Sequence, residues 1–378
     1  KNHNLSNFLL PKVKGFHFLR NRFRYFFVIY MNNFRNFRIM SKINLKDLAK
    51  HLNISVSSVS KALRDSHEIA EETKKRVRAL ALEIGYSPNP YAGFLRNQKS
   101  KTIALIAPEL TNNFFIQAIS GAESIAQEHD YHILVYTTND DFEKEKSILS
   151  HLMNGRVDGV ILSLASTTKS FNHLTDLIEA GVPIVFFDRI CHEIETAKIT
   201  TNDFASGFNA TEHLIHNGCK KIAYLSISEN LSIDNKRKQG YFEALSKHDF
   251  KIDESLIVRC SNDEKENILI IKSLLTGPNK PDAIFASIEK LALLTYAVCN
   301  DIGIKIPQNL KVISFSNLRT ASLLNPSLTT ITQPAFEMGE IAAKILLKYL
   351  AKRRSIITNE NIVLKSELTV RNSTNNQL

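Results

Sequence analysis

Apolar residues recur at helical spacing just after residue 43, and this pattern is the most specific signal in the chain. A stripe at positions i, i+3, i+4 and i+7 predicts a first short helix, for which Asn44 is the expected cap. A tight turn is expected at Asn53 and Ile54, and Ser55 is placed to cap a second short helix. The first helix is expected to bury Leu45, Leu48, Ala49 and Leu52, and the second Val59, Ala62 and Leu63.

The outward face of the second helix separates two interpretations of this helix-turn-helix. Spacing alone also fits a pair of amphipathic helices from an ordinary helical bundle. However, Val56, Ser57, Ser60 and Lys61 are expected to face solvent, and residues 53–64 contain no acidic side chain. A solvated face normally carries both charge signs. Short hydroxyl side chains and a lysine instead favour a helix that lies close to phosphates and base edges.

Beyond residue 101 the pattern changes to short apolar runs that alternate with helical stretches. Such runs are typical of buried strands in a parallel sheet, and two sets of them predict two doubly wound subdomains. Ligands of these sheets bind at the carboxyl ends of the strands, which places a ligand site in the cleft between two lobes. The expected strands are 103–106, 133–136, 159–162 and 183–187 in one lobe, and 221–226, 255–259, 282–286 and 311–315 in the other.

Length and charge indicate how many domains the chain can form and what kind of partner it binds. A chain of 378 residues is long enough for two or three domains, and its net charge is +10. Residues 1–39 contain eight Lys and Arg and no Asp or Glu, and residues 40–101 contain twelve against six. The remaining residues have a net charge of −4. The positive charge therefore surrounds the helix-turn-helix, as expected for a polyanionic partner.

Several classes of chemistry receive no support from the sequence. The four cysteines, Cys191, Cys219, Cys260 and Cys299, have neither C-x-x-C nor Cys/His ligand spacing, so no metal site, cofactor or disulfide framework is predicted. The P-loop, dinucleotide, nucleophile-elbow and H-E-x-x-H motifs are missing from the sequence, and we do not expect an enzyme. No apolar run approaches the roughly eighteen residues of a membrane span.

The first 39 residues are crowded with Phe, Arg and Asn, and two interpretations of them remain open. They could form a basic arm that binds nucleic acid. Alternatively, they are a non-native or disordered leader translated upstream of the true start, because Met40 immediately precedes the predicted first helix. The apolar stretch at residues 25–30 is too short for a signal peptide.

The helix-turn-helix, a third helix expected from Glu71 to Ile84, and the segment YSPNPYAGFL at residues 86–95 together resemble the lactose-repressor (LacI/GalR) family of bacterial transcription regulators. The resemblance extends to about Arg371. The family usually has a Ser or Thr cap where this chain has Ala70, and that loss costs about 0.5–2 kcal/mol. The resemblance implies DNA contacts by Asn44, Ser55, Val56, Ser57, Ser58, Ser60, Lys61, Arg64, Ala92 and Leu95.

The hinge segment of the resembled family is expected at residues 89–101. Asn89 and Pro90 form a cap and first-turn pair, but a helix this short that contains a glycine should not be stable alone. In the family such a helix folds against the minor groove, where a leucine matching Leu95 is inserted between base pairs. A plain interdomain linker, with Leu95 packed on a domain surface, is the alternative.

Candidate effector residues follow the predicted strands at positions that match the family's ligand-binding loops. Asn113 to Phe115 match an aromatic loop, Asp188 ends a strand, and Gln333 closes the crossover signature PSLTTITQ at residues 326–333. Ile288 stands where the family usually has a polar residue, so a less polar cleft wall is expected. The full set is Asn113, Phe114, Phe115, Asp188, Arg237, Ile288, Glu289, Asn317 and Gln333.

The resemblance implies a helix-turn-helix headpiece (40–88), a hinge (89–101), and a two-lobed α/β body of the periplasmic-binding-protein type (102–371) before a tail at 372–378. We expect the lobes to be about 102–200 with 335–362, and 201–332 with 363–371. The implied function is that of a cytoplasmic repressor that binds a pseudo-palindromic operator as a homodimer and responds to a sugar-related effector. The alternative is a sugar-binding carrier of the periplasmic type, which would lack the helix-turn-helix.

Overall fold

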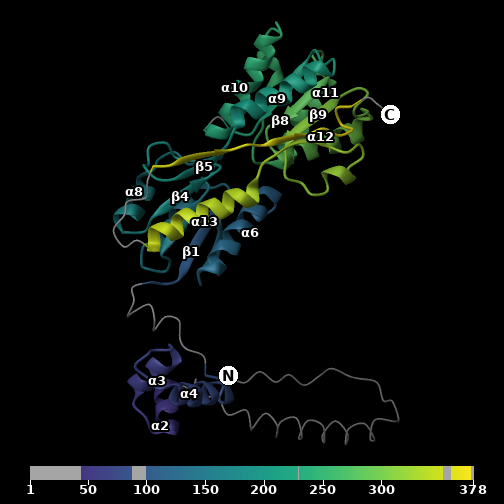
Figure 1. The fold of residues 1–378 in the computed structure, drawn as a ribbon. Helices are drawn as coiled ribbons and strands as arrows, with labels where there is room; N and C mark the ends of the chain where they lie inside the picture. The colour runs from purple at the N-terminus through teal and green to yellow at the C-terminus, as the bar shows by residue number, and fades with distance from the viewer. Residues whose placement is uncertain (1–43, 87–98, 229, 352–358, 376–378) are drawn as a thin grey trace, which may run out of the picture. The chain divides into compact units, whose positions relative to one another are not determined.

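The computed structural model describes residues 44–86, 99–228, 230–351 and 359–375, which form two separate compact units (Figure 1). The first unit contains the predicted headpiece and the second contains the body. The leader and the hinge residues Ala92 and Leu95 lie outside the described residues. Among the described helices, none is both long and apolar enough to cross a membrane.

Three helices form the described part of the headpiece: α2 (Leu45–Leu52), α3 (Val56–Leu63) and α4 (Glu71–Glu83). Asn44 caps α2 as expected, because its Oδ1 accepts the backbone N–H of Lys46 at 2.8 Å. Asn53 ends α2 in the left-handed conformation, with φ of 52°, which turns the chain into α3. The six buried core residues are Leu48, Ala49, Val59, Ala62, Val77 and Ala81.

Ala70 occupies the N-cap position of α4 and makes no side-chain hydrogen bond there. The expected loss of a cap is therefore confirmed, and α4 still begins at Glu71. A charged cluster supports this end of the helix instead: Lys74 lies 2.6 Å from Glu71 and 3.1 Å from Asp65. Asp65 also pairs with Arg78 at 2.7 Å, so α4 holds the loop that follows α3.

The first lobe of the body is a six-stranded sheet in the order β11-β5-β4-β3-β1-β2, with all neighbouring strands parallel. Helices cover both faces, and α6 and α13 lie side by side on one of them (Figure 1). The strands are β1 (Thr102–Ala107), β2 (His132–Thr137), β3 (Gly159–Leu162), β4 (Ile184–Phe187), β5 (Lys198–Thr201) and β11 (Asn361–Leu364). The helices are α6 (Asn113–Glu128), α7 (Phe142–Leu152), α8 (Asn172–Glu179) and α13 (Ala335–Ala351).

The second lobe repeats this architecture in the order β12-β10-β9-β8-β6-β7, with only the β10–β12 pair antiparallel among its described strands. The strands are β6 (Ile222–Ser226), β7 (Ile257–Arg259), β8 (Ala283–Ala286), β9 (Lys311–Phe315), β10 (Thr329–Thr332) and β12 (Glu367–Thr369). The helices are α9 (Asp203–His216), α10 (Ser232–Lys247), α11 (Glu264–Thr276) and α12 (Glu289–Ile302), with short 3₁₀ turns at Glu254–Leu256 and Ala321–Leu323.

Two expectations about this body need correction. Strand β2 was expected to be buried, but it lies at the edge of its sheet, and Leu134 and Val135 are 42% and 40% exposed. An apolar run does not distinguish an edge strand from a central one. The expected tail also begins inside the second lobe, because Ser373 and Thr374 are fully buried and Ser373 Oγ accepts the Thr329 backbone N–H at 2.8 Å.

Candidate functional site

Helix α3 presents a short polar face at its amino end. Val56 is 42% exposed and Ser57 is exposed beside it. Ser55 caps the helix, because its Oγ accepts the Ser58 backbone N–H at 3.0 Å. The Ser55 hydroxyl also lies 2.7 Å from that of Ser57 and 2.8 Å from that of Ser58. This end of α3 therefore combines free helix N–H groups with hydroxyls and no acidic side chain, which suits contact with a phosphate backbone.

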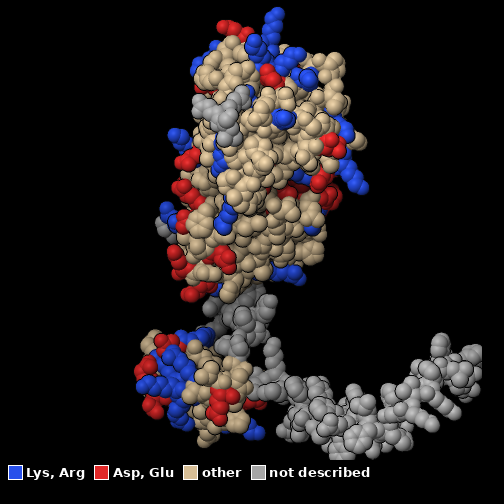
Figure 2. Space-filling model, turned by 90° about the vertical axis from the view of Figure 1, so that its right-hand side faces the viewer, with Lys and Arg blue, Asp and Glu red and all other residues tan. Residues whose placement is uncertain are grey.

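Lys61 and Arg64, the two cations at the carboxyl end of α3, both contact other groups of the headpiece. Lys61 Nζ pairs with the Glu68 carboxylate, and this pairing lowers the pKa of Glu68. Arg64 Nε donates to the Ser60 carbonyl at 2.9 Å, which positions the guanidinium at the end of the helix. Figure 2 shows Lys and Arg side chains gathered on one face of the headpiece, with Asp and Glu side chains around them. Any other anionic partner of Lys61 would have to replace Glu68.

The second unit has a narrow pocket in the cleft between its lobes, with a cavity volume of about 30 Å³ that opens to solvent. Asn113 stands next to this pocket and its Nδ2 donates to Glu289 Oε1 at 3.3 Å. The other eight predicted effector residues line the pocket: Phe114, Phe115, Asp188, Arg237, Ile288, Glu289, Asn317 and Gln333. Five further lining residues were outside the predicted set: Asn112, Arg189, Ile233, Phe315 and Ser316.

Arg237 is the most strongly fixed of these side chains. Its Nε donates to Asp203 Oδ1 at 2.8 Å and its Nη1 donates to the Ser287 carbonyl at 2.7 Å. The guanidinium carbon lies 3.6 Å from the centre of the Phe315 ring. Its Nη2 is buried without a hydrogen-bond partner in the protein. A buried charged donor that is held in place and still unsatisfied favours an acceptor on a ligand.

A second arginine reaches the pocket from the first lobe. Arg189 Nη1 donates to Asp140 Oδ1 at 2.7 Å, while its Nε is buried without a partner in the protein. Burial opposes ionisation of Asp140, but Arg189 and hydrogen bonds from Ser166 outweigh it and lower its pKa. The sequence analysis assigned a role to Asp188 and none to the adjacent Arg189, because nothing in the sequence indicated that Asp140 lies against Arg189.

Asp188 and Asp203 are buried acids of the cleft, as Arg237 is a buried cation. Burial raises the pKa of Asp188, although Arg237 and Arg189 oppose this, and burial also raises the pKa of Asp203 against the effect of Arg237. Gln333 Nε2 donates to Asp188 Oδ1 at 3.3 Å and to Thr201 Oγ1 at 3.2 Å. The pocket therefore offers paired acceptors and donors at fixed positions, an arrangement suited to vicinal hydroxyl groups.

The aromatic and apolar part of the pocket differs from the expectation in detail. Phe114 and Phe115 line the pocket but are 4% and 2% exposed, because they pack against each other and against Phe187. Ile288 does give the opposite wall an apolar residue. Its neighbour Glu289 accepts a hydrogen bond from Ser316 Oγ at 2.6 Å, so this wall also remains polar.

Direct hydrogen bonds join the two lobes across the cleft. Gln117 of α6 donates from Nε2 to the Asn317 carbonyl at 3.2 Å and accepts from Asn317 Nδ2 at 3.1 Å. Asn317 Nδ2 also donates to the Gln333 carbonyl at 2.7 Å. The lobes are thus held by a small polar contact that a change in cleft contents could strengthen or break.

Two family models match the two units. The model described as "Bacterial regulatory proteins, lacI family" matches residues 44–89, and "Periplasmic binding proteins and sugar binding domain of LacI family" matches residues 100–367. The chain belongs to the LacI family. This LacI-family member is a DNA-binding transcription regulator with an effector-binding domain, and the interpretation as a periplasmic carrier is set aside.

Relatives and solved structures agree with this assignment. The ribose operon repressor of Haemophilus influenzae is 30% identical, and the match covers 86% of this chain and 98% of the repressor. A solved structure described as a "periplasmic binding protein/LacI transcriptional regulator" from Alkaliphilus metalliredigens, complexed with D-xylulofuranose, is 27% identical over 72% of this chain and 98% of the other, with a TM-score of 0.63. The lac repressor dimer bound to operator shares the fold at 20% identity, with a TM-score of 0.76 over 88% of this chain and 99% of the other.

Proposed function

We propose that this LacI-family regulator is a repressor that binds a pseudo-palindromic operator as a homodimer and is controlled by a small polyhydroxylated effector in the interlobe cleft. The observation that carries the effector proposal is the buried, unpaired Nη2 of Arg237 at the pocket. Family members bind operator DNA as dimers and respond to sugars, which supports both parts of the proposal.

The chemistry of the pocket favours a sugar or a sugar derivative over an apolar or purely anionic ligand. Arg189 and Arg237 offer donors, while Asp188 and Gln333 offer acceptors that a hydroxyl can satisfy. Ile233 and Ile288 add a small apolar surface for C–H groups. The carboxylates of Asp188 and Glu289 would oppose a ligand with several negative charges, because like charges repel each other.

The edge strand β2 supports the homodimer. Leu134 and Val135 leave apolar surface on an unpaired sheet edge, a combination that proteins usually cover. Phe336 of α13 is also 45% exposed in the same lobe. A two-fold copy of this surface would bury these groups and present two headpieces to the two half-sites of an operator.

A thermal-shift screen of the full chain against sugars, glycosides and nucleobases tests the effector proposal. A ligand that binds only the folded protein raises its melting temperature in a concentration-dependent manner, whereas an inert compound does not. We expect a hit among the sugars or glycosides. Stabilisation by nucleobases alone would contradict the proposed chemistry.

Selection of bound sequences from a random DNA pool tests the operator proposal. We expect enriched sites with two inverted half-sites, and sedimentation of the free protein as a dimer. An enriched site without two-fold symmetry, or a monomer bound at one half-site, would contradict the homodimeric arrangement.

A further inference from the structure

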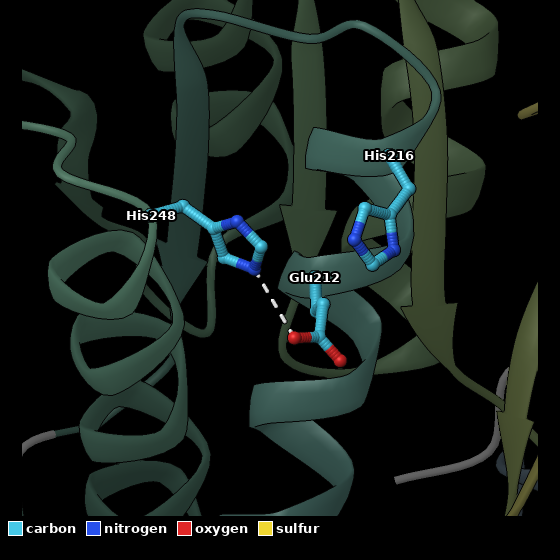
Figure 3. Close-up of side chains that lie close together, drawn as sticks. All are labelled: Glu212, His216 and His248. Atoms are coloured by element: carbon cyan, nitrogen blue, oxygen red, sulfur yellow. Dashed lines mark hydrogen bonds and ion pairs between the residues drawn. The ribbon is translucent and has the colours of Figure 1, made fainter.

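Away from the cleft, the second lobe brings together three side chains that can bind a metal. Glu212, His216 and His248 each offer one ligand atom, and these atoms all lie within 4.8 Å of one another. It is the one such group of three among the residues that the structure describes. Figure 3 shows the two imidazole rings on either side of the Glu212 carboxylate, which accepts a hydrogen bond from His248 Nε2 at 3.1 Å.

Helix packing explains why these residues meet. Glu212 and His216 are four residues apart in α9 and therefore lie on the same face, while His248 follows the last residue of α10. The two helices pack with their backbones in close contact, since a Cβ on Gly207 would come within 2.3 Å of the Arg237 carbonyl oxygen. His248 consequently reaches the last turn of α9.

The surroundings of this cluster favour a cation. Both α9 and α10 end here, and each helix C-terminus has a partial negative charge. Lys247 and His248 donate hydrogen bonds to the same oxygen of the Glu212 carboxylate. The two imidazoles face each other at a centroid distance of 5.3 Å, and His216 is exposed to solvent.

We propose that Glu212, His216 and His248 form a binding site for a divalent transition-metal ion, with Zn²⁺ as its best-fitting occupant. Two imidazole nitrogens and one carboxylate oxygen are a typical zinc ligand set that leaves a further position for water. Tetrahedral ligands at about 2.0–2.1 Å from the ion lie about 3.3 Å apart, so the donors need to approach by roughly 1.5 Å at most. The exposed His216 ring and the half-buried His248 ring can reach this by side-chain rotation. Mg²⁺ and Ca²⁺ prefer oxygen ligands and do not fit.

Lys247 shares the carboxylate of this site. Its Nζ lies 2.9 Å from Glu212 Oε1, and its side chain is 57% exposed, so it can swing into solvent. The ammonium and the metal ion compete for the same carboxylate. Removal of Lys247 should therefore raise the affinity for Zn²⁺, a result that a purely structural polar cluster would not give.

The bound ion would join the carboxyl ends of two parallel helices whose other parts form the cleft. Asp203 begins α9 and pairs with Arg237 of α10, so the same helix pair carries the cleft arginine and the proposed metal site. Zn²⁺ would thus stabilise the second lobe without touching the effector pocket. This site does not depend on the proposed effector or operator.

Isothermal titration of Zn²⁺ into EDTA-treated full-length protein tests the proposal, with native mass spectrometry to count the ions. We expect one saturable site per chain and a rise in melting temperature. His216→Ala and His248→Ala should each weaken binding at least tenfold, since loss of a group that only hydrogen-bonds to a metal ligand already costs about 10–100-fold. Glu212→Gln should weaken it as well, and Lys247→Ala should strengthen it.

His151→Ala is the matched control, because His151 is an exposed histidine in the last turn of α7, in the other lobe. This variant should bind Zn²⁺ like the wild type. Absence of saturable binding in the wild type would overturn the proposal. So would unchanged Zn²⁺ affinity in the double variant His216→Ala/His248→Ala, because the ion would then bind elsewhere. Circular dichroism of each variant checks that the fold is retained.

Discussion

At the residue scale, Lys61 illustrates how a predicted contact can be occupied within the protein itself. Its outward position on α3 was predicted from the sequence, but its pairing with Glu68 was not. Exposed ion pairs are weak, so a base edge or a phosphate can replace the carboxylate. We therefore expect Glu68 to compete with DNA for Lys61.

We predict that Lys61→Ala weakens binding to the selected operator more than binding to random DNA. A lysine that reads a base edge contributes discrimination of about 1–3 kcal/mol, whereas a phosphate contact contributes to both complexes. Gel-shift titrations on both DNAs at one salt concentration measure this. Equal weakening on both would assign Lys61 to the phosphate backbone.

Glu68→Gln should have the opposite effect to Lys61→Ala. Removal of the competing carboxylate frees the lysine, so binding to random DNA should tighten, most clearly at low salt where charges are least screened. The same titrations over a range of salt concentrations detect it. If Glu68→Gln weakens DNA binding, the Glu68 carboxylate supports the structure of α3 and does not compete with DNA for Lys61.

We predict that Arg237→Lys retains the fold but loses the effector response. Lysine keeps the positive charge beside Asp203, whereas its single ammonium cannot reproduce the three directions of the guanidinium. Loss of a charged hydrogen bond of about 1.5–3 kcal/mol weakens an effector at least tenfold. Calorimetry with the ligand found by screening gives the affinity. Arg319→Ala, at an exposed arginine of the same lobe, is the control and should bind normally.

At the element scale, the uncapped start of α4 gives a direct test of local stability. Ala70 already has the extended backbone of an N-cap, with φ −60° and ψ 143°. We predict that Ala70→Ser stabilises the headpiece by about 0.5–2 kcal/mol, because the hydroxyl can accept an unpaired N–H of the first turn. Chemical unfolding followed by circular dichroism measures the change. Ala79→Ser, on the exposed face in the middle of α4, should be neutral or destabilising.

Elements with a strong apolar pattern were predictable from the sequence, and those without it were not. The runs at residues 159–162 and 311–315 coincide with β3 and β9, and the other expected strands differ by one or two residues at their ends. Strands β5 and β10 were missed because KITT and TTIT are rich in threonine and polar atoms. Their hydroxyls are satisfied inside the fold, as Thr329 Oγ1 is by the Arg371 carbonyl at 3.0 Å.

The cleft was partly predictable for a related reason. Residues in motifs, such as Gln333, could be placed from the resemblance to the family. Residues whose position depends on contacts between distant segments could not, and Phe315 under Arg237 is an example. The cluster of Glu212, His216 and His248 has the same origin, since only the packing of α9 against α10 brings the third residue to the other two.

At the scale of the whole molecule, control of DNA binding requires that the effector favours one arrangement of the lobes. Gln117 provides two hydrogen bonds across the cleft to Asn317. We predict that Gln117→Ala destabilises the lobe arrangement held by these two hydrogen bonds by about 0.5–1.5 kcal/mol per bond. Effector affinity should change in proportion. Small-angle scattering with and without effector would detect the shift. Gln127→Ala, an exposed glutamine at the other end of α6, is the control.

We expect a substitution in the hinge to affect DNA binding and not effector affinity, in contrast to a substitution in the cleft. Leu95 lies outside the described residues, and its role rests on its match to the family's inserted leucine. We predict that Leu95→Ala weakens the operator complex and reduces DNA bending, while the free protein keeps its effector affinity. Gel-shift titration with circularly permuted operator fragments, together with calorimetry in the absence of DNA, separates the two effects. Because coupling is reciprocal, a variant that no longer bends DNA should also show less change in operator affinity on effector binding. Wild-type affinity and bending in Leu95→Ala would mean that the hinge is a plain linker, and that the lobes control the headpieces by another route.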